Sequence, residues 1–363
     1  MKYYNFSKIN AKKATYNVVF GERSNGKTYA ALKQAVKEYV EAGGSQFVYV
    51  RRWKEDLTGR RASLLFAGIN TNGEITKLTD GKFAGVHYFA SKFYLCNYDE
   101  NGKPIYSDGD CIGFTMSLSD GEHDKSTSFP NVRTIIFDEF LTNKTYLVNE
   151  FVLFMNLVST VVRRRDDVKI YMLGNTVNKY CPYFQEMGLD HVAKMTQGSI
   201  DIYRYGESKL TVAVEYCRSS ANDKEGNKSQ HYFAFSNPKL EMITGGAWEL
   251  NIYPHLPMKY KPSDVIMRYF IEFADRVFDC EIIQIGSVIF TYIHDKTTPI
   301  RQPDKHLIYS LECRPERNYI RSMFRPITKA QERVAWFFQN DRVFYQNNDV
   351  GDAISNYLKL CKK

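Results

Sequence analysis

The chain lacks the features that mark secreted, zinc-stabilised and membrane-spanning proteins. Its 7 cysteines are scattered over 363 residues, with no C-x-x-C pair and no nearby pair of histidines. This scatter argues against disulfides and zinc, and it favours free buried thiols in a reducing compartment. Residues 1–10 have no apolar signal-peptide core, and no stretch approaches the roughly 20 apolar residues of a membrane span. We therefore expect a soluble intracellular protein without a membrane partner.

No internal repeat and no low-complexity tract stands out either, so neither a repeat array nor a fibrous composition is indicated. The length instead suggests two domains, or three small ones. Hydrophobic residues make up 44% of the chain, which is enough for sizeable cores, and aromatic residues make up 15%. The formal net charge of +8 favours a polyanionic partner, although many basic proteins have none.

Residues 16–28 carry the strongest motif of the chain. Residues 16–20 are a short apolar run rich in β-forming residues, and residues 29–41 have the apolar spacing of a helix. Between them lies an octet that fits G-x-x-x-x-G-K-[ST], the phosphate-binding P-loop: Gly21, Glu22, Arg23, Ser24, Asn25, Gly26, Lys27 and Thr28. A glycine-rich turn that arose by chance is the alternative, and the flanking strand and helix make it the weaker interpretation.

The chemistry expected of this octet follows from its residue types. Gly21 and Gly26 permit backbone angles and close approaches that a Cβ atom would block. Successive backbone N–H groups and the N-terminus of the helix would then face the phosphates. We expect Lys27 to reach the β- and γ-phosphates and the Thr28 hydroxyl to bind Mg²⁺.

A second apolar run, residues 46–50, ends in the basic sequence Arg-Arg-Trp-Lys at 51–54. In a parallel α/β sheet the carboxyl ends of the strands line the ligand crevice, so these cations could meet phosphates. A solvated run of charges is an equally good interpretation. Residues 56–128 resemble an insertion, with strands over 93–98 and 111–118 around a hairpin turn signal.

Residues 134–139 form the second strong motif, an apolar strand that ends in Asp138 and Glu139. Asp138 fits the aspartate that holds Mg²⁺ in P-loop proteins. The carboxylate of Glu139 can polarise an attacking water as a general base. The pair therefore favours an ATPase that hydrolyses its substrate over a kinase, and an ordinary acidic strand end becomes the weaker interpretation.

Polar residues also follow two later elements. Residues 147–162 have helical spacing and end in three arginines at 163–165. One cation suits the helix dipole, but three exceed that need, so one of them could be an arginine finger for a neighbouring subunit. Residues 169–173 indicate a buried strand, and Asn175 just beyond it could sense the γ-phosphate, position a water or simply belong to a turn. This order of elements matches the additional-strand class of ATPases, which is a fold analogy.

The composition changes from about residue 200. Residues 200–262 are mixed and contain several prolines, which indicates a small connecting domain. Residues 263–363 indicate a second α/β domain with a β-meander. Asp279, Glu281 and Asp295 lie on its strands, but they do not form a convincing ligand set for a two-metal nuclease. We therefore expect these carboxylates to serve solubility at strand edges.

Residues 48–54, 129–140 and 172–175 resemble one known family, the DNA-packaging ATPases of small short-tailed bacteriophages. These encapsidation motor proteins are related to the large terminases, and the similarity covers the N-terminal part of the chain. The resemblance implies an α/β fold with three parts: a P-loop additional-strand ATPase domain with a β-hairpin-rich insertion at 1–199, a linker domain at 200–262, and a ribonuclease H-like domain that has lost nuclease activity at 263–363.

The resemblance also implies a function. Members of the family form a homomeric ring, typically a pentamer, at the portal vertex of a preformed capsid. They hydrolyse ATP with Mg²⁺ to translocate double-stranded DNA inward. The implied partners are double-stranded DNA, the portal (connector) and capsid proteins and, in some relatives, a packaging RNA. The implied location is the host cell cytoplasm, with transient attachment to the viral procapsid.

The resemblance also implies roles for the residues of this chain that match the family's site positions. The P-loop and the Asp138–Glu139 pair keep the roles given above. Arg163 matches the finger that acts on the next subunit, and Arg165 is the second choice because the register of the three arginines is ambiguous. Lys54 matches a basic residue that acts across the subunit boundary in nucleotide exchange.

Three other functions stay open at this point. One is a helicase or DNA-remodelling ATPase that acts without a capsid, and another is a terminase with an active nuclease domain. The third is a nucleotide-gated assembly protein with negligible turnover, against which the Asp138–Glu139 pair argues.

Overall fold

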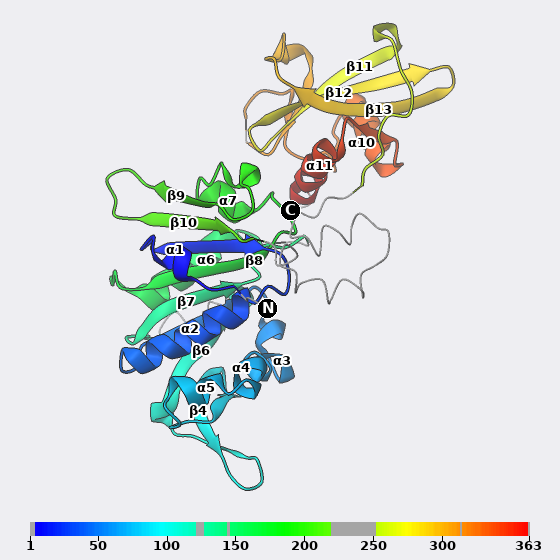
Figure 1. Cartoon of the computed structure of the whole chain (residues 1–363). Helices are drawn as coiled ribbons and strands as arrows, with labels where there is room; N and C mark the ends of the chain where they lie inside the picture. The colour runs from blue at the N-terminus through cyan, green and yellow to red at the C-terminus, as the bar shows by residue number, and fades with distance from the viewer. Residues whose placement is uncertain (1–3, 121–126, 144–145, 219–251, 313, 362–363) are drawn as a thin grey trace. The chain divides into compact units, whose positions relative to one another are not determined.

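The computed structural model describes residues 4–120, 127–143, 146–218, 252–312 and 314–361. The chain divides into two compact units, residues 1–249 and 250–363, and each is considered by itself (Figure 1). Within the described residues, no helix is both long enough and apolar enough to cross a membrane.

The first unit is organised around a ten-stranded sheet with the order β3-β4-β6-β2-β7-β8-β1-β10-β9, and β5 pairs with β4. The six strands from β6 to β10 in this order are parallel, and the pairs β3–β4, β4–β6 and β9–β10 are antiparallel. The strands are β1 Tyr16–Gly21, β2 Gln46–Arg51, β3 Gly85–Phe89, β4 Lys92–Tyr98, β5 Pro104–Ile105, β6 Cys111–Ser117, β7 Val132–Asp138, β8 Lys169–Asn175, β9 Ile200–Arg204 and β10 Thr211–Tyr216.

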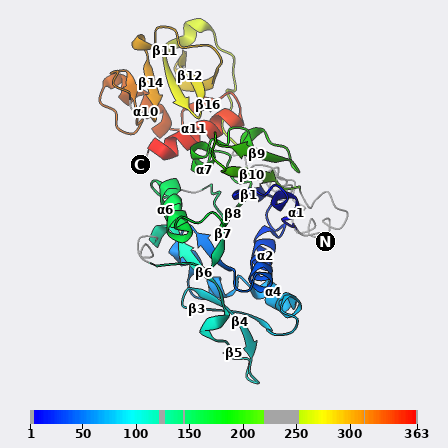
Figure 2. The ribbon, with the colours of Figure 1, turned by 90° about the vertical axis from the view of Figure 1, so that its left-hand side faces the viewer.

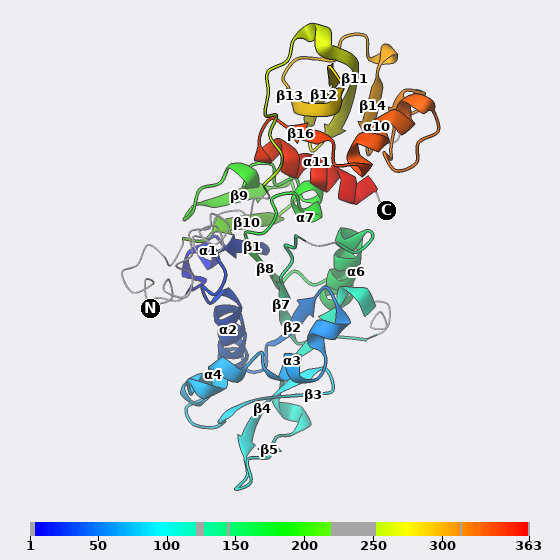
Figure 3. The same cartoon turned by 90° about the vertical axis from the view of Figure 1, so that its right-hand side faces the viewer.

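Helices cover both faces of this sheet, with α2 on one face and α6 on the other (Figures 2 and 3). Successive residues of β1 serve the two faces in turn: Val18 and Phe20 belong to the core that contains α6, and Val19 belongs to the core that contains α2. A strand buried on both faces has no polar alternation, which is why β1 is a continuous apolar run. The helices are α1 Ser7–Asn10, α2 Lys27–Glu41, α3 Arg60–Ser63, α4 Ala67–Thr71, α5 Glu74–Leu78, α6 Glu150–Val162 and α7 Pro182–Glu186.

The central strands confirm the strands predicted near the two strongest motifs. β1, β2 and β8 cover the predicted apolar runs and extend them by one or two residues. β7 begins two residues before the predicted strand and ends at Asp138, so Glu139 lies just beyond it. Because these four strands are parallel, their carboxyl ends lie at one edge of the sheet. The P-loop after β1, the acidic pair at the end of β7 and Asn175 at the end of β8 therefore meet at that edge.

The region predicted to be an insertion is instead built into the main sheet. β6 lies beside β2 in a parallel pair that matches Phe47 with Gly113, and β4 then adds to the outer side of β6. The turn signal at 99–103 connects β4 to the short β5 instead of to β6, and the Asp99 N–H donates to the Lys103 carbonyl at 3.0 Å. The local pattern predicted the strands correctly, but it did not reveal their partners.

The structure also corrects the start of the expected linker domain. Part of the expected 200–262 linker forms β9 and β10, and β10 pairs in parallel with β1 from Tyr16↔Val212 to Phe20↔Tyr216. These two strands therefore belong to the sheet of the first unit. The rest of the predicted linker between 219 and 251 lies outside the described residues.

The second unit contains a six-stranded sheet with the order β15-β14-β11-β12-β13-β16. β11, β12 and β13 form the expected antiparallel meander, while β14 pairs in parallel with β11, β15 with β14 and β16 with β13. The elements are β11 Val265–Phe273, β12 Arg276–Ile285, β13 Val288–Lys296, β14 Leu307–Ser310, β15 Tyr319–Ile320, α10 Lys329–Gln339, β16 Val343–Tyr345 and α11 Asn348–Cys361.

The acidic residues of this meander are not the exposed strand-edge residues that we expected. Asp279 and Glu281 lie on β12, in the middle of the sheet, and only 6% and 3% of their surface is exposed. Asp295 is separate from them, because it forms an ion pair with Arg276 at 2.6 Å. The prediction of a solubility role is therefore wrong for the first two residues.

Candidate functional site

The P-loop has the backbone geometry that its glycines predict. Gly26 is the N-cap of α2 and has a left-handed φ of 89°, which a glycine adopts without steric cost. At Gly21 a Cβ atom would lie 2.9 Å from Cβ of Cys217, so only glycine permits this close approach. Within the loop Glu22 and Asn25 are buried, whereas Arg23 and Ser24 are exposed. The loop therefore presents backbone and two exposed side chains at the N-terminus of α2.

The Lys27 ammonium lies inside the curve of this loop. Nζ donates to the carbonyl of Glu22 at 2.7 Å and to the Oδ1 atoms of Asn25 at 3.1 Å and Asn175 at 3.3 Å. Only 5% of Lys27 is exposed, and burial lowers the pKa of its ammonium. The contact with Asn175 arises because that residue is the register partner of Gly21 between β8 and β1. Asn175 therefore lies at the P-loop edge, where the sequence analysis placed it, and its contact with Lys27 is an addition from the structure.

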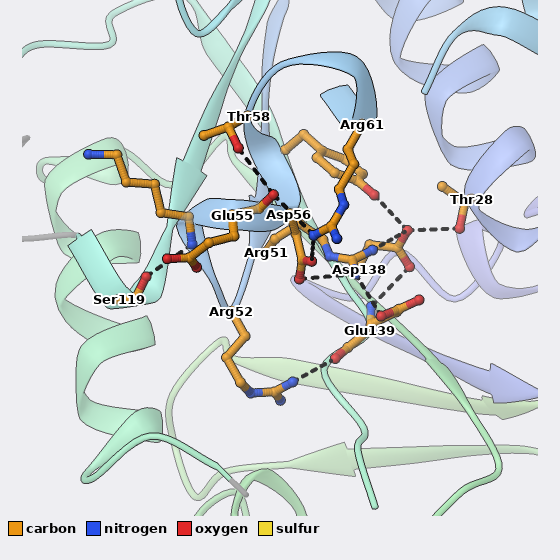
Figure 4. A network of polar contacts seen from close by, with 12 residues as sticks. Thr28, Arg51, Arg52, Glu55, Asp56, Thr58, Arg61, Ser119, Asp138 and Glu139 are labelled. Carbon is orange, nitrogen blue, oxygen red and sulfur yellow. Dashed lines mark hydrogen bonds and ion pairs between the residues drawn. The ribbon is translucent and has the colours of Figure 1, made fainter. Parts of the chain in front are cut away.

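Thr28 and Asp138 are also brought together, as the sequence predicts for two ligands of one ion. The Thr28 hydroxyl donates to Oδ2 of Asp138 at 2.9 Å (Figure 4). A hydroxyl and a carboxylate oxygen at the phosphate-binding loop are ligand types that suit Mg²⁺. The two residues therefore fit a magnesium site.

Tyr49 is a member of this site that the sequence analysis missed. Its hydroxyl donates to the same Oδ2 atom of Asp138 at 2.7 Å, and the side chain is fully buried. Burial and the adjacent Asp138 carboxylate raise the pKa of Tyr49 well above its ordinary value, so it remains a hydrogen-bond donor. The only sequence signal was its position on β2, two residues before the basic segment.

Glu139 leaves the strand in an unusual backbone conformation. Its φ is +56°, which is uncommon for a residue with a side chain, and 56% of the side chain is exposed. Oε2 accepts from Nη2 of Arg51 at 2.6 Å, and Nη1 of Arg51 lies 3.9 Å from Asp138 (Figure 4). The candidate general base is therefore held by a cation at the end of β2.

This arrangement also affects Arg51. Burial opposes its charge, but Tyr49, Glu139 and Asp138 outweigh burial and raise the pKa of the guanidinium. Arg51 is thus a permanent cation between the two acidic residues. The sequence placed it at the phosphate edge without identifying Glu139 as its partner.

The other basic residues after β2 have different roles. Arg52 is buried and pairs with Glu150 at 2.8 Å, and it donates to the carbonyls of Glu139 and Phe140 at 3.2 and 2.7 Å. It therefore supports the backbone that carries Glu139 and does not face phosphates. Lys54 is 62% exposed and pairs with Asp120 at 2.6 Å, in the segment that follows β6.

The three arginines after α6 differ in exposure, because Arg163 and Arg164 are exposed and Arg165 is partly buried. Because α6 connects the carboxyl end of β7 to the amino end of β8, Arg163 lies at the opposite edge of the sheet from its own P-loop. Arg163 is exposed and donates to the Thr127 carbonyl at 2.8 Å. Arg165 instead donates to five backbone carbonyls: those of Phe129, Pro130, Val132, Val161 and Val162. These contacts argue against Arg165 as a finger and leave Arg163 as the candidate.

A cavity of about 830 Å³ runs along α2, from Gly26 at the P-loop to Glu41 at the other end of the helix. Tyr4, Phe6, Gly26 and Tyr29 are among the residues that line it. Phe6 also packs against Tyr171, with ring centroids 5.1 Å apart. The cavity therefore places aromatic walls next to the phosphate-binding loop.

The sequence model of the Podovirus DNA encapsidation protein (Gp16) family matches residues 1–204. The DNA packaging protein of Bacillus phage phi29 is 32% identical over 185 residues, and that of Bacillus phage B103 is 33% identical over 176 residues. These alignments cover 50% and 48% of this chain, and 49% and 48% of the relatives. The chain thus spans about half the length of the curated relatives it matches.

A solved structure of the bacteriophage Phi-29 viral genome packaging motor assembly has a similar fold, with a TM-score of 0.59 and 21% sequence identity. The similarity covers 99% of each chain, and at this identity it describes the fold alone. The family match spans more than half of the sequence and includes the P-loop, the Asp138–Glu139 pair and Asn175. The chain therefore belongs to the Podovirus DNA encapsidation protein (Gp16) family.

Proposed function

We propose that this protein is an ATP-hydrolysing motor that translocates double-stranded viral DNA into a preformed capsid. The observation that carries the proposal is the meeting of Lys27, Asp138 and Asn175 at one edge of three neighbouring parallel strands. Family membership adds the biological setting, because the matched relatives are DNA packaging proteins of Bacillus phages.

In this proposal the P-loop binds the phosphates of ATP. Lys27 contributes a buried positive charge that the carbonyl of Glu22 and the amide of Asn175 hold in place. Thr28 and Asp138 hold Mg²⁺, which when bound neutralises charge on the phosphoryl oxygens. The cavity beside α2 receives the base.

Glu139 is the residue to which we assign the general-base role. Its carboxylate must accept a proton from the attacking water, and in this structure Oε2 is engaged by Arg51. This ion pair competes with the base role, because the Arg51 N–H occupies one lone pair of that oxygen. Asn175 orients the Lys27 ammonium, and Arg163 of one subunit stabilises charge at the site of the next.

If Arg163 of one subunit acts at the nucleotide site of the next subunit, the protein must form an oligomer. We propose a homomeric ring, most simply a pentamer, on the portal vertex of the procapsid in the host cytoplasm. The portal (connector) and capsid proteins are then its protein partners, a packaging RNA is an additional one, and Lys54 acts at the subunit boundary. Double-stranded DNA would be gripped through its phosphates, since packaging must ignore sequence.

We propose that the second unit is a ribonuclease H-like domain without nuclease activity. An antiparallel meander, β11 to β13, continued by the parallel strands β14 and β15 supports the fold. The ion pair of Asp295 with Arg276 leaves that carboxylate outside any shared metal site with Asp279. This argues against the two-metal chemistry of an active terminase nuclease.

The proposal is tested by mixing two inactive variants. Glu139→Gln removes the general base, and Arg163→Ala removes the finger, so each alone should lower DNA-stimulated ATP hydrolysis by about 10³-fold or more. A ring that contains both variants has some interfaces with an intact Glu139 from one subunit and an intact Arg163 from the next. We expect phosphate release to recover partly in the mixture, and Arg164→Ala is the matched control because Arg164 is an exposed neighbour.

Other outcomes would change the assignment. Full activity of Arg163→Ala alone would exclude it as the finger. The motor function would be wrong if double-stranded DNA failed to stimulate hydrolysis even with procapsids present. Preference for single strands with unwinding would instead indicate a helicase, and an absence of phosphate release would indicate a nucleotide-gated assembly protein.

A further inference from the structure

The second unit contains three metal-ligand side chains on one face of its sheet. Asp279 and Glu281 are two residues apart on β12, so their side chains point to the same face. His294 on β13 is the register partner of Asp279. One ligand atom from each residue lies within 4.8 Å of the other two. Ligands of one zinc ion are at most about 4 Å apart, so small side-chain rotations would close the site.

The Asp279 carboxylate independently points to a ligand at this cluster. Its Oδ1 atom is buried and has no hydrogen-bond partner, and the residue is only 6% exposed. Buried polar atoms in folded proteins almost always have a partner, because an uncompensated buried charge is costly. A cation at Oδ1 would satisfy this oxygen.

The histidine is held in the form that binds metals. Nδ1 of His294 lies 3.1 Å from the backbone carbonyl of Asp295, and because a carbonyl can only accept, Nδ1 carries the proton. In the neutral imidazole Nε2 then carries the lone pair that binds a metal, and Nε2 lies 3.8 Å from Oε2 of Glu281. Metal-binding histidines typically donate their second ring N–H to a carbonyl or carboxylate in this way.

The second carboxylate is held by outer partners. Arg268 donates to Oε1 of Glu281, and the Tyr260 hydroxyl donates to Oε2. These contacts fix the orientation of the Glu281 side chain, as outer-shell groups do at metal sites. The Arg268 charge also competes with a cation, so we expect weaker binding than at a closed four-ligand zinc site.

We propose that Asp279, Glu281 and His294 together bind one divalent transition-metal ion. Two carboxylates and one imidazole suit Zn²⁺ or Mn²⁺ better than Mg²⁺, which prefers an all-oxygen shell. Three protein ligands leave room for water. The ion would link β12 to β13 through its ligands, and through Glu281 it would be connected to Tyr260, which precedes the meander. This site is separate from the nucleotide site and does not depend on the motor function.

The test is a titration of the full chain, first treated with a chelator and kept free of nucleotide. We expect calorimetry with Zn²⁺ to show one equivalent bound at this site, and bound Co²⁺ to give a d–d absorption band that differs from that of aqueous Co²⁺. Asp279→Asn and His294→Gln should each lower Zn²⁺ affinity by at least about tenfold. Asp304→Asn is the matched control, because Asp304 is an exposed aspartate of the same unit.

Several results would overturn the proposal. One is a wild-type chain that binds no Zn²⁺ and no Mn²⁺, and another is binding that both variants leave unchanged, which would place the ion on other groups such as cysteines. Equal affinity for Mg²⁺ would contradict the choice of a transition metal. Circular dichroism checks that the variants fold, and His294→Gln preserves the test if Asp279→Asn does not fold, because His294 lies nearer the surface.

Discussion

At the scale of single residues, the ion pair between Arg51 and Glu139 bears directly on the proposed hydrolysis. A separation of 2.6 Å engages Oε2 of Glu139, and the +56° φ of that residue fixes the direction from which its side chain starts. The proposed hydrolysis mechanism needs the same carboxylate next to a water. In that mechanism Arg51 is a positioning residue that competes with the active orientation of Glu139.

Replacing this cation should release the base. We expect Arg51→Met to raise the ATPase rate measured without DNA by roughly fivefold, because a partly exposed ion pair is worth about 1 kcal/mol. The stimulation by DNA should shrink accordingly. Steady-state kcat with and without DNA measures both effects.

Arg61→Met is the matched control for that experiment. Arg51 lies 3.4 Å from Asp56, and Arg61 pairs with the same carboxylate at 3.2 Å. Arg61 is exposed, and no dashed line joins it to Glu139 in Figure 4. We expect it to leave both rates unchanged. A fall of both rates in Arg51→Met would show instead that Arg51 takes part in the chemistry itself.

Much of the site could be predicted at the scale of single residues. Lys27, Thr28, Asp138 and Asn175 meet as the motifs predicted, because each motif is anchored to the end of a parallel strand. Tyr49 could not be predicted as a partner of Asp138. Its contact depends on β2 lying beside β7, which the local pattern does not contain.

At the scale of elements, α6 and the strand before it are joined by Arg165. Its guanidinium donates hydrogen bonds to carbonyls at the end of α6 and in the segment that leads into β7. The helix C-terminus leaves such carbonyls without intrahelical donors, so a cation there satisfies them. The sequence predicts a capping role for one of the three arginines, and only the contacts identify that residue as Arg165.

Arg165→Ala should therefore act on stability. We expect the free energy of unfolding to fall by roughly 2–4 kcal/mol, because several carbonyls lose a charged donor. The midpoint of urea unfolding, followed by circular dichroism, measures the loss. Arg164→Ala should change it by no more than about 0.5 kcal/mol, since Arg164 is exposed. Equal midpoints for the two variants would show that the Arg165 contacts do not stabilise the fold.

The strands show which elements a sequence pattern can reveal. The apolar runs of β1, β2, β7 and β8 are buried on both faces, so they are visible as continuous stretches. The sequence pattern places β6 in an insertion and β10 in a linker, although both strands lie in the sheet of the first unit. Pairing between strands distant in sequence depends on tertiary contacts, and no local signal encodes it.

At the scale of the whole molecule, the excess of positive charge has a measurable consequence. A motor that grips phosphates releases counterions on binding, so its affinity for DNA should fall steeply with salt. We expect the DNA concentration for half-maximal ATPase stimulation to rise as KCl is raised. The ATPase rate without DNA, measured over the same range, controls for effects of salt on the nucleotide site. A half-maximal concentration that does not change with KCl would contradict binding through phosphates.

The parallel pairing of β10 with β1 has a consequence for where this protein can be divided. The family match ends at residue 204, whereas β10 covers Thr211–Tyr216 and the Cys217 N–H donates to the Phe20 carbonyl at 2.9 Å. A fragment that ends at 204 would leave β1 with a row of unsatisfied N–H and C=O groups next to the P-loop. Such an open edge recruits strands from other chains, so that fragment would tend to aggregate even though it holds every nucleotide-binding motif.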